Sequence, residues 1–181
     1  ISNSLNYNKI SNQLDIHKRT LNKFVDITRD HFLFSFVDPY YTDPSNEISK
    51  MTKIYCNDFG ILNYLAGKNS MPRLPIVYEK EEIENFIFNE LCRHEDISFV
   101  HFYRTIAKAE IDFIGKTEKG IIPIELKFQE NKKKKSVALK NFNERYKDSI
   151  IKTIVITKNK LSIQDETIYL PAVLLPFTKL I

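Results

Sequence analysis

Glycine is scarce in this chain, with four residues among 181. Such a low number argues against a phosphate-binding loop built from glycines and against an all-β barrel, which needs many tight turns. The two cysteines, Cys56 and Cys92, lack CxxC spacing, and the four histidines form no zinc-binding pattern around them. We therefore expect two reduced thiols and no zinc site.

Long apolar runs are also missing. No stretch approaches the roughly 20 apolar residues that cross a bilayer, and no signal peptide opens the chain. The sequence therefore predicts no membrane partner and a cytoplasmic location. It begins with Ile1 in a polar stretch rather than with Met, so we expect it to be a piece of a longer protein.

The remaining composition is ordinary for a folded globular protein. Hydrophobic residues make up 43% of the chain and charged residues 28%, and thirteen Phe with nine Tyr provide bulky side chains for a core. The length suits one comfortable domain or two small ones. A net charge of +4 permits a DNA partner without requiring one.

The first half of the chain, residues 1–70, has the pattern of a winged helix. The spacing of its apolar residues predicts two helices, two strands and a closing helix, at residues 6–14, 20–30, 32–37, 53–56 and 58–65. Two helices followed by a β-hairpin with a long tip is the element order of a winged helix. The stretch 67–75, which holds a glycine and two prolines, is typical of a linker.

The second half, residues 71–181, is expected to form a mixed α/β (α+β) core. The pattern predicts a helix, a meander of three strands, a basic helix, a buried strand and a closing segment, at residues 79–94, 98–105, 109–115, 120–128, 133–146, 150–157 and 168–177. The turn signal KTEKG joins the second and third strands. This order gives a mixed sheet flanked by helices.

Three charged residues on two of these strands suggest a catalytic site. Side chains alternate along a strand, so Glu125 and Lys127 in GIIPIELKF share one face. Asp112 in AEIDFI lies on the neighbouring antiparallel strand, where it can approach Glu125. Two close carboxylates repel each other and are tolerated when a divalent cation lies between them. Mg²⁺, or Mn²⁺, is therefore the expected cofactor.

Such a site suits the hydrolysis of a phosphodiester. A metal ion polarises a phosphate oxygen and lowers the pKa of a bound water, while a lysine positions the nucleophile or stabilises developing charge. Lys127 fits that last role, and Glu84 on the preceding helix would add a further carboxylate. The predicted catalytic residues are thus Glu84, Asp112, Glu125 and Lys127, with the three acids as metal ligands. The alternative is that these acids are surface charges on a solvated strand.

These motifs and their order resemble a known group of proteins. An acid on a first helix (IENFIFNEL), an acid on the second strand (EIDF) and a Glu-x-Lys pair (IELK) resemble the PD-(D/E)xK, restriction-endonuclease-like superfamily. Together with KIYCNDFGILNYL, FYRT and AEIDFI in the same order, they more closely resemble the C-terminal region of a family of prokaryotic AAA-type ATPases. That region, a winged helix followed by a nuclease-like domain, is the domain of unknown function 4143.

The resemblance implies a fold like that of Holliday-junction resolvases, a divalent metal, DNA as partner, and Asp112, Glu125 and Lys127 as carriers of the chemistry. It also implies an ATP-binding module on the N-terminal side, whose motif G-x-x-x-x-G-K-[ST] this chain lacks. One departure from the superfamily pattern is that Ile111, and not proline, precedes Asp112. Resolvase-like domains work as dimers where two strands are cut, so a homodimer is a further expectation.

Basic residues near these motifs are candidate nucleic-acid contacts. They are Lys18, Arg19, Lys23, Arg104, Lys132, Lys133, Lys134 and Lys135. The first three lie near the second helix, where nearby aspartates dilute the positive charge, so this unit either binds DNA or serves interaction or dimerisation. Arg104 either clamps a phosphate or pairs with Glu110. The run 132–135 either meets a phosphate backbone or is a solvated helix start.

Our leading hypothesis from the sequence is a DNA-directed, metal-dependent nuclease domain that forms the C-terminal part of an ATPase. Two rivals stay open. One is a nuclease fold that binds DNA or protein without cutting, and the other is an interaction module that positions an ATPase. Histidines His17, His31, His94 and His101 are expected to be structural, not metal ligands.

Overall fold

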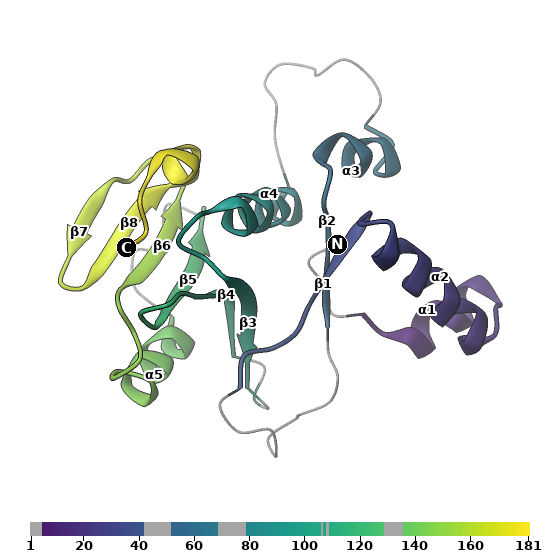
Figure 1. Ribbon diagram of the computed structural model, residues 1–181, viewed down its shortest axis with the longest axis horizontal. Helices are drawn as coiled ribbons and strands as arrows, with labels where there is room; N and C mark the ends of the chain where they lie inside the picture. The colour runs from purple at the N-terminus through teal and green to yellow at the C-terminus, as the bar shows by residue number, and fades with distance from the viewer. Residues whose placement is uncertain (1–4, 42–51, 69–78, 106, 108, 129–135) are drawn as a thin grey trace. The chain divides into compact units, whose positions relative to one another are not determined.

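The computed structural model describes residues 5–41, 52–68, 79–105, 107, 109–128 and 136–181 (Figure 1). The chain divides into two compact units. The first comprises Ile1–Asp38 and Ser49–Phe86, and the second Pro39–Ile48 and Ile87–Ile181. One helix, Lys80–Arg93, begins in the first unit and ends in the second. The predicted boundary between residues 70 and 71 lies outside the described residues.

The first unit contains three helices and a two-stranded antiparallel sheet. Its elements are α1 (Tyr7–Leu14), α2 (Lys18–Asp30), β1 (Phe34–Val37), β2 (Lys53–Cys56) and α3 (Phe59–Leu65). Side chains cap two of the helices, since Asn6 accepts from the backbone N–H of Lys9 and Asp58 from that of Ile61. The predicted order of two helices and a strand pair is confirmed.

The start of α4 (Lys80–Arg93) is anchored on β2. The Asn85 side chain accepts from the backbone N–H of Cys56 at 2.7 Å and donates to its carbonyl at 2.8 Å. A side-chain amide thus satisfies both backbone groups of a strand residue, as a neighbouring strand would do. Because Asn85 is buried, these bonds explain why the first turns of α4 belong to the first unit.

The second unit is built on a six-stranded mixed sheet. Its strands are β3 (Phe99–Arg104), β4 (Glu110–Lys116), β5 (Ile121–Lys127), β6 (Thr153–Thr157), β7 (Ser162–Gln164) and β8 (Thr167–Pro171), in the order β3-β4-β5-β6-β8-β7. The first three strands form an antiparallel meander, and β6 and β8 continue the sheet in parallel. The predicted mixed α/β fold class is confirmed.

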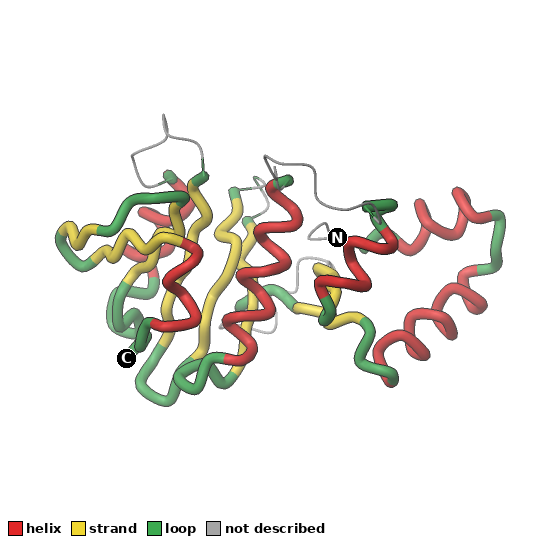
Figure 2. The backbone as a smooth tube through the Cα atoms, turned by 90° about the horizontal axis from the view of Figure 1, so that it is seen from above, coloured by secondary structure: helices red, strands yellow, loops and turns green. Residues whose placement is uncertain are grey.

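Helices cover both faces of this sheet (Figures 1 and 2). On one face, α5 (Val137–Arg145) packs an aromatic and aliphatic cluster, in which the rings of Phe142 and Tyr103 lie 4.7 Å apart. On the other, Phe88 from the second half of α4 contacts Phe113 of β4 at 6.4 Å between ring centroids. Burial on both faces explains why β5 and β6 read as nearly continuous apolar runs.

Several predicted boundaries shift for local reasons. The first strand begins at Phe34, because Phe32 has a positive φ of 55° and still belongs to the turn after α2. Helix α5 begins at Val137, where Ser136 caps it, and the predicted residues 133–135 lie outside the described residues. The closing segment divides into β8 and the 3₁₀ helix η2 (Ala172–Phe177).

No helix in the described ranges is long and apolar enough to cross a membrane.

Candidate active site

A β-bulge in β4 sets the position of Asp112. Between the pairs His101↔Ile114 and Tyr103↔Ile111, β3 contributes one residue and β4 two, Asp112 and Phe113. Bulges of this kind bend a strand, redirect side chains and occur often beside active sites. The pairing of β4 with β5 also ends here, at Phe113↔Ile124. Asp112 therefore lies in the bulge against β3, one residue beyond the last pair of β4 with β5.

The Asp112 side chain bridges the gap that opens between β4 and β5. Its Oδ2 atom accepts a hydrogen bond of 2.8 Å from the backbone N–H of Leu126. A side-chain carboxylate thus contacts a backbone group that lies past the last ladder pair. This bond places the Asp112 carboxylate beside the peptide that joins Glu125 and Leu126.

Glu125 and Lys127 lie two positions apart on β5 and form an ion pair. The distance between Glu125 Oε2 and Lys127 Nζ is 3.5 Å, and each side chain is 10% exposed. The same oxygen accepts from the backbone N–H of Ser136 at 3.4 Å. Ser136 is the N-cap of α5, so the positive end of that helix dipole also faces Glu125. Two sources of positive charge therefore lie beside this carboxylate.

Asp112 and Glu125 provide hard oxygen ligands, which suit Mg²⁺ or Mn²⁺. Within the described part of the chain, no group of three or more His, Cys, Asp or Glu residues could hold a metal ion. Mg²⁺ is, however, commonly bound through one or two carboxylates, with water and substrate phosphate completing its shell. The two acids fit a site of that open kind and do not fit a closed all-protein cage.

The structure places Glu84, the third predicted acid, in the first unit. Its Oε1 atom accepts from Lys53 Nζ at 3.0 Å and from the Tyr55 hydroxyl at 2.9 Å. The side chains of Lys53 and Glu84 are 3% and 4% exposed. This buried network has an evident structural use, because it ties α4 to β2. A metal-binding role for Glu84 stays a prediction, and such a metal would compete with Lys53.

Arg104 adopts the ion-pair arrangement that the sequence left open. Its Nε atom lies 3.7 Å from Glu110 Oε2, and the two residues face each other across β3 and β4. Both side chains remain about a quarter to a third exposed, at 26% and 30%. An exposed pair of this kind is weak, so it leaves the guanidinium available for exchange with a phosphate.

The remaining predicted nucleic-acid residues divide into two groups. Lys18, Arg19 and Lys23 lie on α2 and are exposed. Two apolar residues of the same helix, Phe24 and Ile27, are also 56% and 51% exposed. The helix surface thus agrees with DNA binding and with a protein contact alike. The lysine run 132–135 lies outside the described residues.

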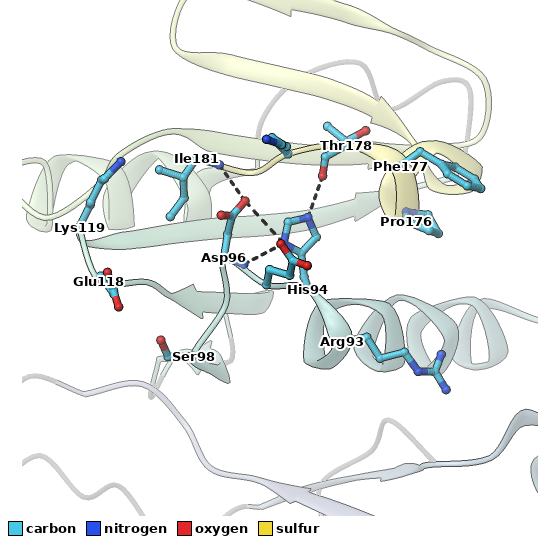
Figure 3. A pocket seen from close by; sticks show the side chains of 12 residues that line it. Arg93, His94, Asp96, Ser98, Glu118, Lys119, Pro176, Phe177, Thr178 and Ile181 are labelled. Atoms are coloured by element: carbon cyan, nitrogen blue, oxygen red, sulfur yellow. Dashed lines mark hydrogen bonds and ion pairs between the residues drawn. The ribbon is translucent and has the colours of Figure 1, made fainter.

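A hollow of about 690 Å³ lies elsewhere in the second unit (Figure 3). It is lined by the end of α4 and the residues that follow it, by the turn at Glu118 and Lys119, and by the end of η2 with the segment after it. His94 spans part of its wall: Nε2 donates to the Thr178 carbonyl at 2.7 Å, and Nδ1 accepts from the Asp96 N–H at 3.2 Å. Both ring nitrogens thus have hydrogen-bond partners within the protein, which agrees with a structural role for His94. The hollow lies at the opposite end of β4 and β5 from Asp112 and Glu125.

Comparison with known protein families gives two matches. The family model described as Domain of unknown function (DUF4143) matches residues 81–175, from the first turn of α4 to η2. A second, Domain of unknown function (DUF8612), matches residues 1–71. No curated protein and no solved structure matches the chain. Because the first model covers just over half of the sequence, the chain belongs to the DUF4143 family.

Proposed function

We propose that this chain is a DNA-directed, metal-dependent phosphodiesterase domain with a nuclease-like site at Asp112, Glu125 and Lys127. One observation carries the proposal. At the bulge in β4, Asp112 leaves the ladder and bonds to β5 beside Glu125, while Lys127 lies 3.5 Å from that second acid. Two acids and a lysine that meet at one strand end are the groups that phosphodiester hydrolysis needs.

Each residue of the site would have its own role. Asp112 and Glu125 would hold Mg²⁺ through their carboxylates, and Lys127 would orient the attacking water or stabilise charge on the phosphate. When bound, the metal polarises a phosphate oxygen and lowers the pKa of its water. The N-terminus of α5, at Ser136, adds a second fixed positive field on the same side.

The element order supports the finer assignment to the PD-(D/E)xK superfamily. Helix α4, the meander β3-β4-β5, helix α5 and the parallel strand β6 follow one another as that resemblance implies. In the same proposal, the first unit is a winged helix. The whole chain is the C-terminal part of a cytoplasmic AAA-type ATPase that acts as a homodimer. The helices and the strand pair of the first unit support the winged-helix part of this proposal, and the resemblance of the sequence motifs supports the ATPase context.

A second candidate is a nuclease fold that binds DNA or protein without cutting. The specific observation in its favour is that both acids are bonded to the protein itself. Asp112 Oδ2 accepts from Leu126, and Glu125 Oε2 is shared by Lys127 and Ser136. If these bonds are never exchanged for a metal, the constellation is purely structural.

A cleavage assay separates the two candidates. Wild type, Asp112→Ala, Glu125→Ala and the control Glu118→Ala are incubated with branched and linear DNA in Mg²⁺ or Mn²⁺. Glu118 is an exposed acid in the turn between the same two strands, so its variant controls for a lost surface charge. We expect both site variants to abolish cleavage and Glu118→Ala to retain it. Unchanged cleavage by Asp112→Ala would refute the assignment, and DNA binding by wild type without cleavage would favour the second candidate.

A further inference from the structure

Two tight turns in the second unit are built alike, and each holds an exposed lysine. In the first, the Thr117 hydroxyl donates to the Gly120 carbonyl at 2.9 Å and accepts from Lys119 N at 3.1 Å. In the second, the Thr157 hydroxyl donates to the Lys160 carbonyl at 2.8 Å and accepts from Lys160 N at 3.0 Å. Lys119 and Lys158 are both exposed.

These two turns lie at opposite ends of the sheet. Thr157 ends β6 and pairs with Lys127, whereas Thr117 lies between β4 and β5, at the start of β5. A strand rises about 3.3 Å per residue and neighbouring strands lie about 4.8 Å apart. The Cα atom of Lys158 is therefore roughly 6 Å from that of Lys127 and about 11 Å from that of Glu125. Lys119 is about 20 Å from Glu125.

Lys160, at the end of the second turn, has a fixed ammonium group. Its Nζ atom lies 3.8 Å from the centroid of the Tyr169 ring, in a cation–π contact. Tyr169 pairs with Val155, and Val155 pairs with Glu125. These three residues form one row across parallel strands, so the cation of Lys160 lies on the same sheet face as the Glu125 carboxylate.

The sheet end that carries the candidate site holds four cations and three acids among the described residues. Arg104, Lys127, Lys158 and Lys160 all lie at this end among the described residues, because β3, β5 and β6 all finish there. Arg104 and Lys127 are the ion-pair partners of Glu110 and Glu125, and Asp112 accepts from the backbone N–H of Leu126. The two lysines of the turn thus extend the cationic surface beyond Lys127.

We propose that the turn Thr157–Lys160 binds a backbone phosphate of the nucleic-acid strand whose neighbouring phosphate lies at Asp112 and Glu125. This inference rests on the proposed function, which makes a nucleic acid the ligand. A strand carries one charge per nucleotide, so a phosphate flanking the one at the site falls within reach of Lys158. The hydrogen bonds of the Thr157 hydroxyl hold the turn in one geometry, and the contact with the Tyr169 ring orients Lys160. Lys119 is more than two Debye lengths, of about 8 Å each, from Glu125 at physiological salt.

The test uses the salt dependence of binding to a short fluorescent DNA duplex, measured without divalent cations so that no strand is cut. Wild type is compared with Lys158→Ala, with the double variant Lys158→Ala/Lys160→Met, and with the matched control Lys119→Ala. The slope of log K against log salt is negative, and each lost phosphate contact reduces its magnitude by about one. We expect the magnitude of the slope to fall by about one for Lys158→Ala and by about two for the double variant. For Lys119→Ala we expect an unchanged slope.

The outcomes separate this inference from the proposed function. A wild type with no salt-dependent DNA affinity would overturn both. A wild type that binds, with equal slopes for Lys158→Ala and Lys119→Ala, would overturn the assignment of the turn and leave the proposed function standing. Thermal denaturation of all variants is the folding control, and both exposed single-lysine variants are expected to melt as wild type does.

Discussion

Among the described residues, each unit has a glutamate–lysine pair that is largely shielded from solvent, and the surroundings of the two pairs differ. Glu84 and Lys53 lie 3.0 Å apart, with side chains 3–4% exposed, and Tyr55 donates to the same oxygen. Glu125 and Lys127 lie 3.5 Å apart, with side chains 10% exposed, at a strand end that a second acid also reaches. The same two residue types therefore support different roles: the first pair is a buried structural anchor, and the second is a candidate for chemistry.

Breaking the first pair is expected to have the largest effect on stability. Lys53→Met leaves the Glu84 carboxylate buried without its cation, and removing one partner of a buried pair costs about 3–5 kcal/mol. We expect the free energy of unfolding, measured by urea denaturation, to fall by that amount. Lys127→Met, the matched variant of the second pair, should lose clearly less. Equal losses of unfolding free energy in Lys53→Met and Lys127→Met would contradict the different roles assigned to the two pairs.

Breaking the second pair is expected to act on catalysis. Lys127→Met keeps an unbranched side chain one atom shorter but removes the charge proposed to stabilise the phosphate. Loss of one such group lowers kcat by about 10² to 10³-fold. Single-turnover DNA cleavage in Mg²⁺ measures this effect, and Lys119→Met controls for the lost surface charge. Cleavage by Lys127→Met at the wild-type rate would contradict a catalytic role for this lysine.

A third variant asks whether the anchor of α4 depends on the ion pair alone. Asn85→Leu removes the amide that satisfies both backbone groups of Cys56. Leaving buried backbone groups unpaired costs about 1–3 kcal/mol. We expect a loss of unfolding free energy in that range, smaller than that of Lys53→Met. No loss at all would show that the ion pair holds the helix without help from Asn85.

The smallest expected effect concerns Glu82, which pairs with Lys68 in the first unit. Burial raises the pKa of this carboxyl, but hydrogen bonds from Lys68 and the Glu79 N–H, with the Lys68 charge, lower it below its ordinary value. A group with a lowered folded-state pKa stabilises the protein above its unfolded pKa, and this stabilisation is lost as the pH falls through the folded pKa. Glu82→Gln should therefore flatten the acid side of the stability profile, by less than about 1 kcal/mol. An unchanged profile in urea denaturation from neutral to acidic pH would refute this.

The comparison of the two pairs also shows what the sequence could predict. Glu125 and Lys127 share a short strand, so their shared face follows from alternation alone. The partners of Glu84 are 31 and 29 residues away, and no local pattern indicates such contacts. The helical spacing placed Glu84 on the helix before the strands, but it could not tell which unit its side chain would contact.

Other features were beyond sequence reasoning for similar reasons. The bulge at Asp112 depends on how β3 and β4 pair, and the sequence AEIDFI reads as an uninterrupted strand. Strand β7 has only three residues, SIQ, too few to show alternation. Sequence reasoning also missed Lys158 and Lys160, because their place beside the site depends on the parallel pairing of β6 with β5. Element types and the pairing of the adjacent strands β4 and β5 were therefore predictable, whereas contacts between strands far apart in the sequence were not.

The most direct test of the central claim is a calorimetric titration of Mn²⁺ into wild type and Asp112→Ala. The account predicts saturable binding to wild type that disappears in the variant, because the two carboxylates of Asp112 and Glu125 form the site together. Thermal melting of the same samples should show metal-dependent stabilisation of wild type only. Absence of binding in wild type, or equal binding in the variant, would contradict the account.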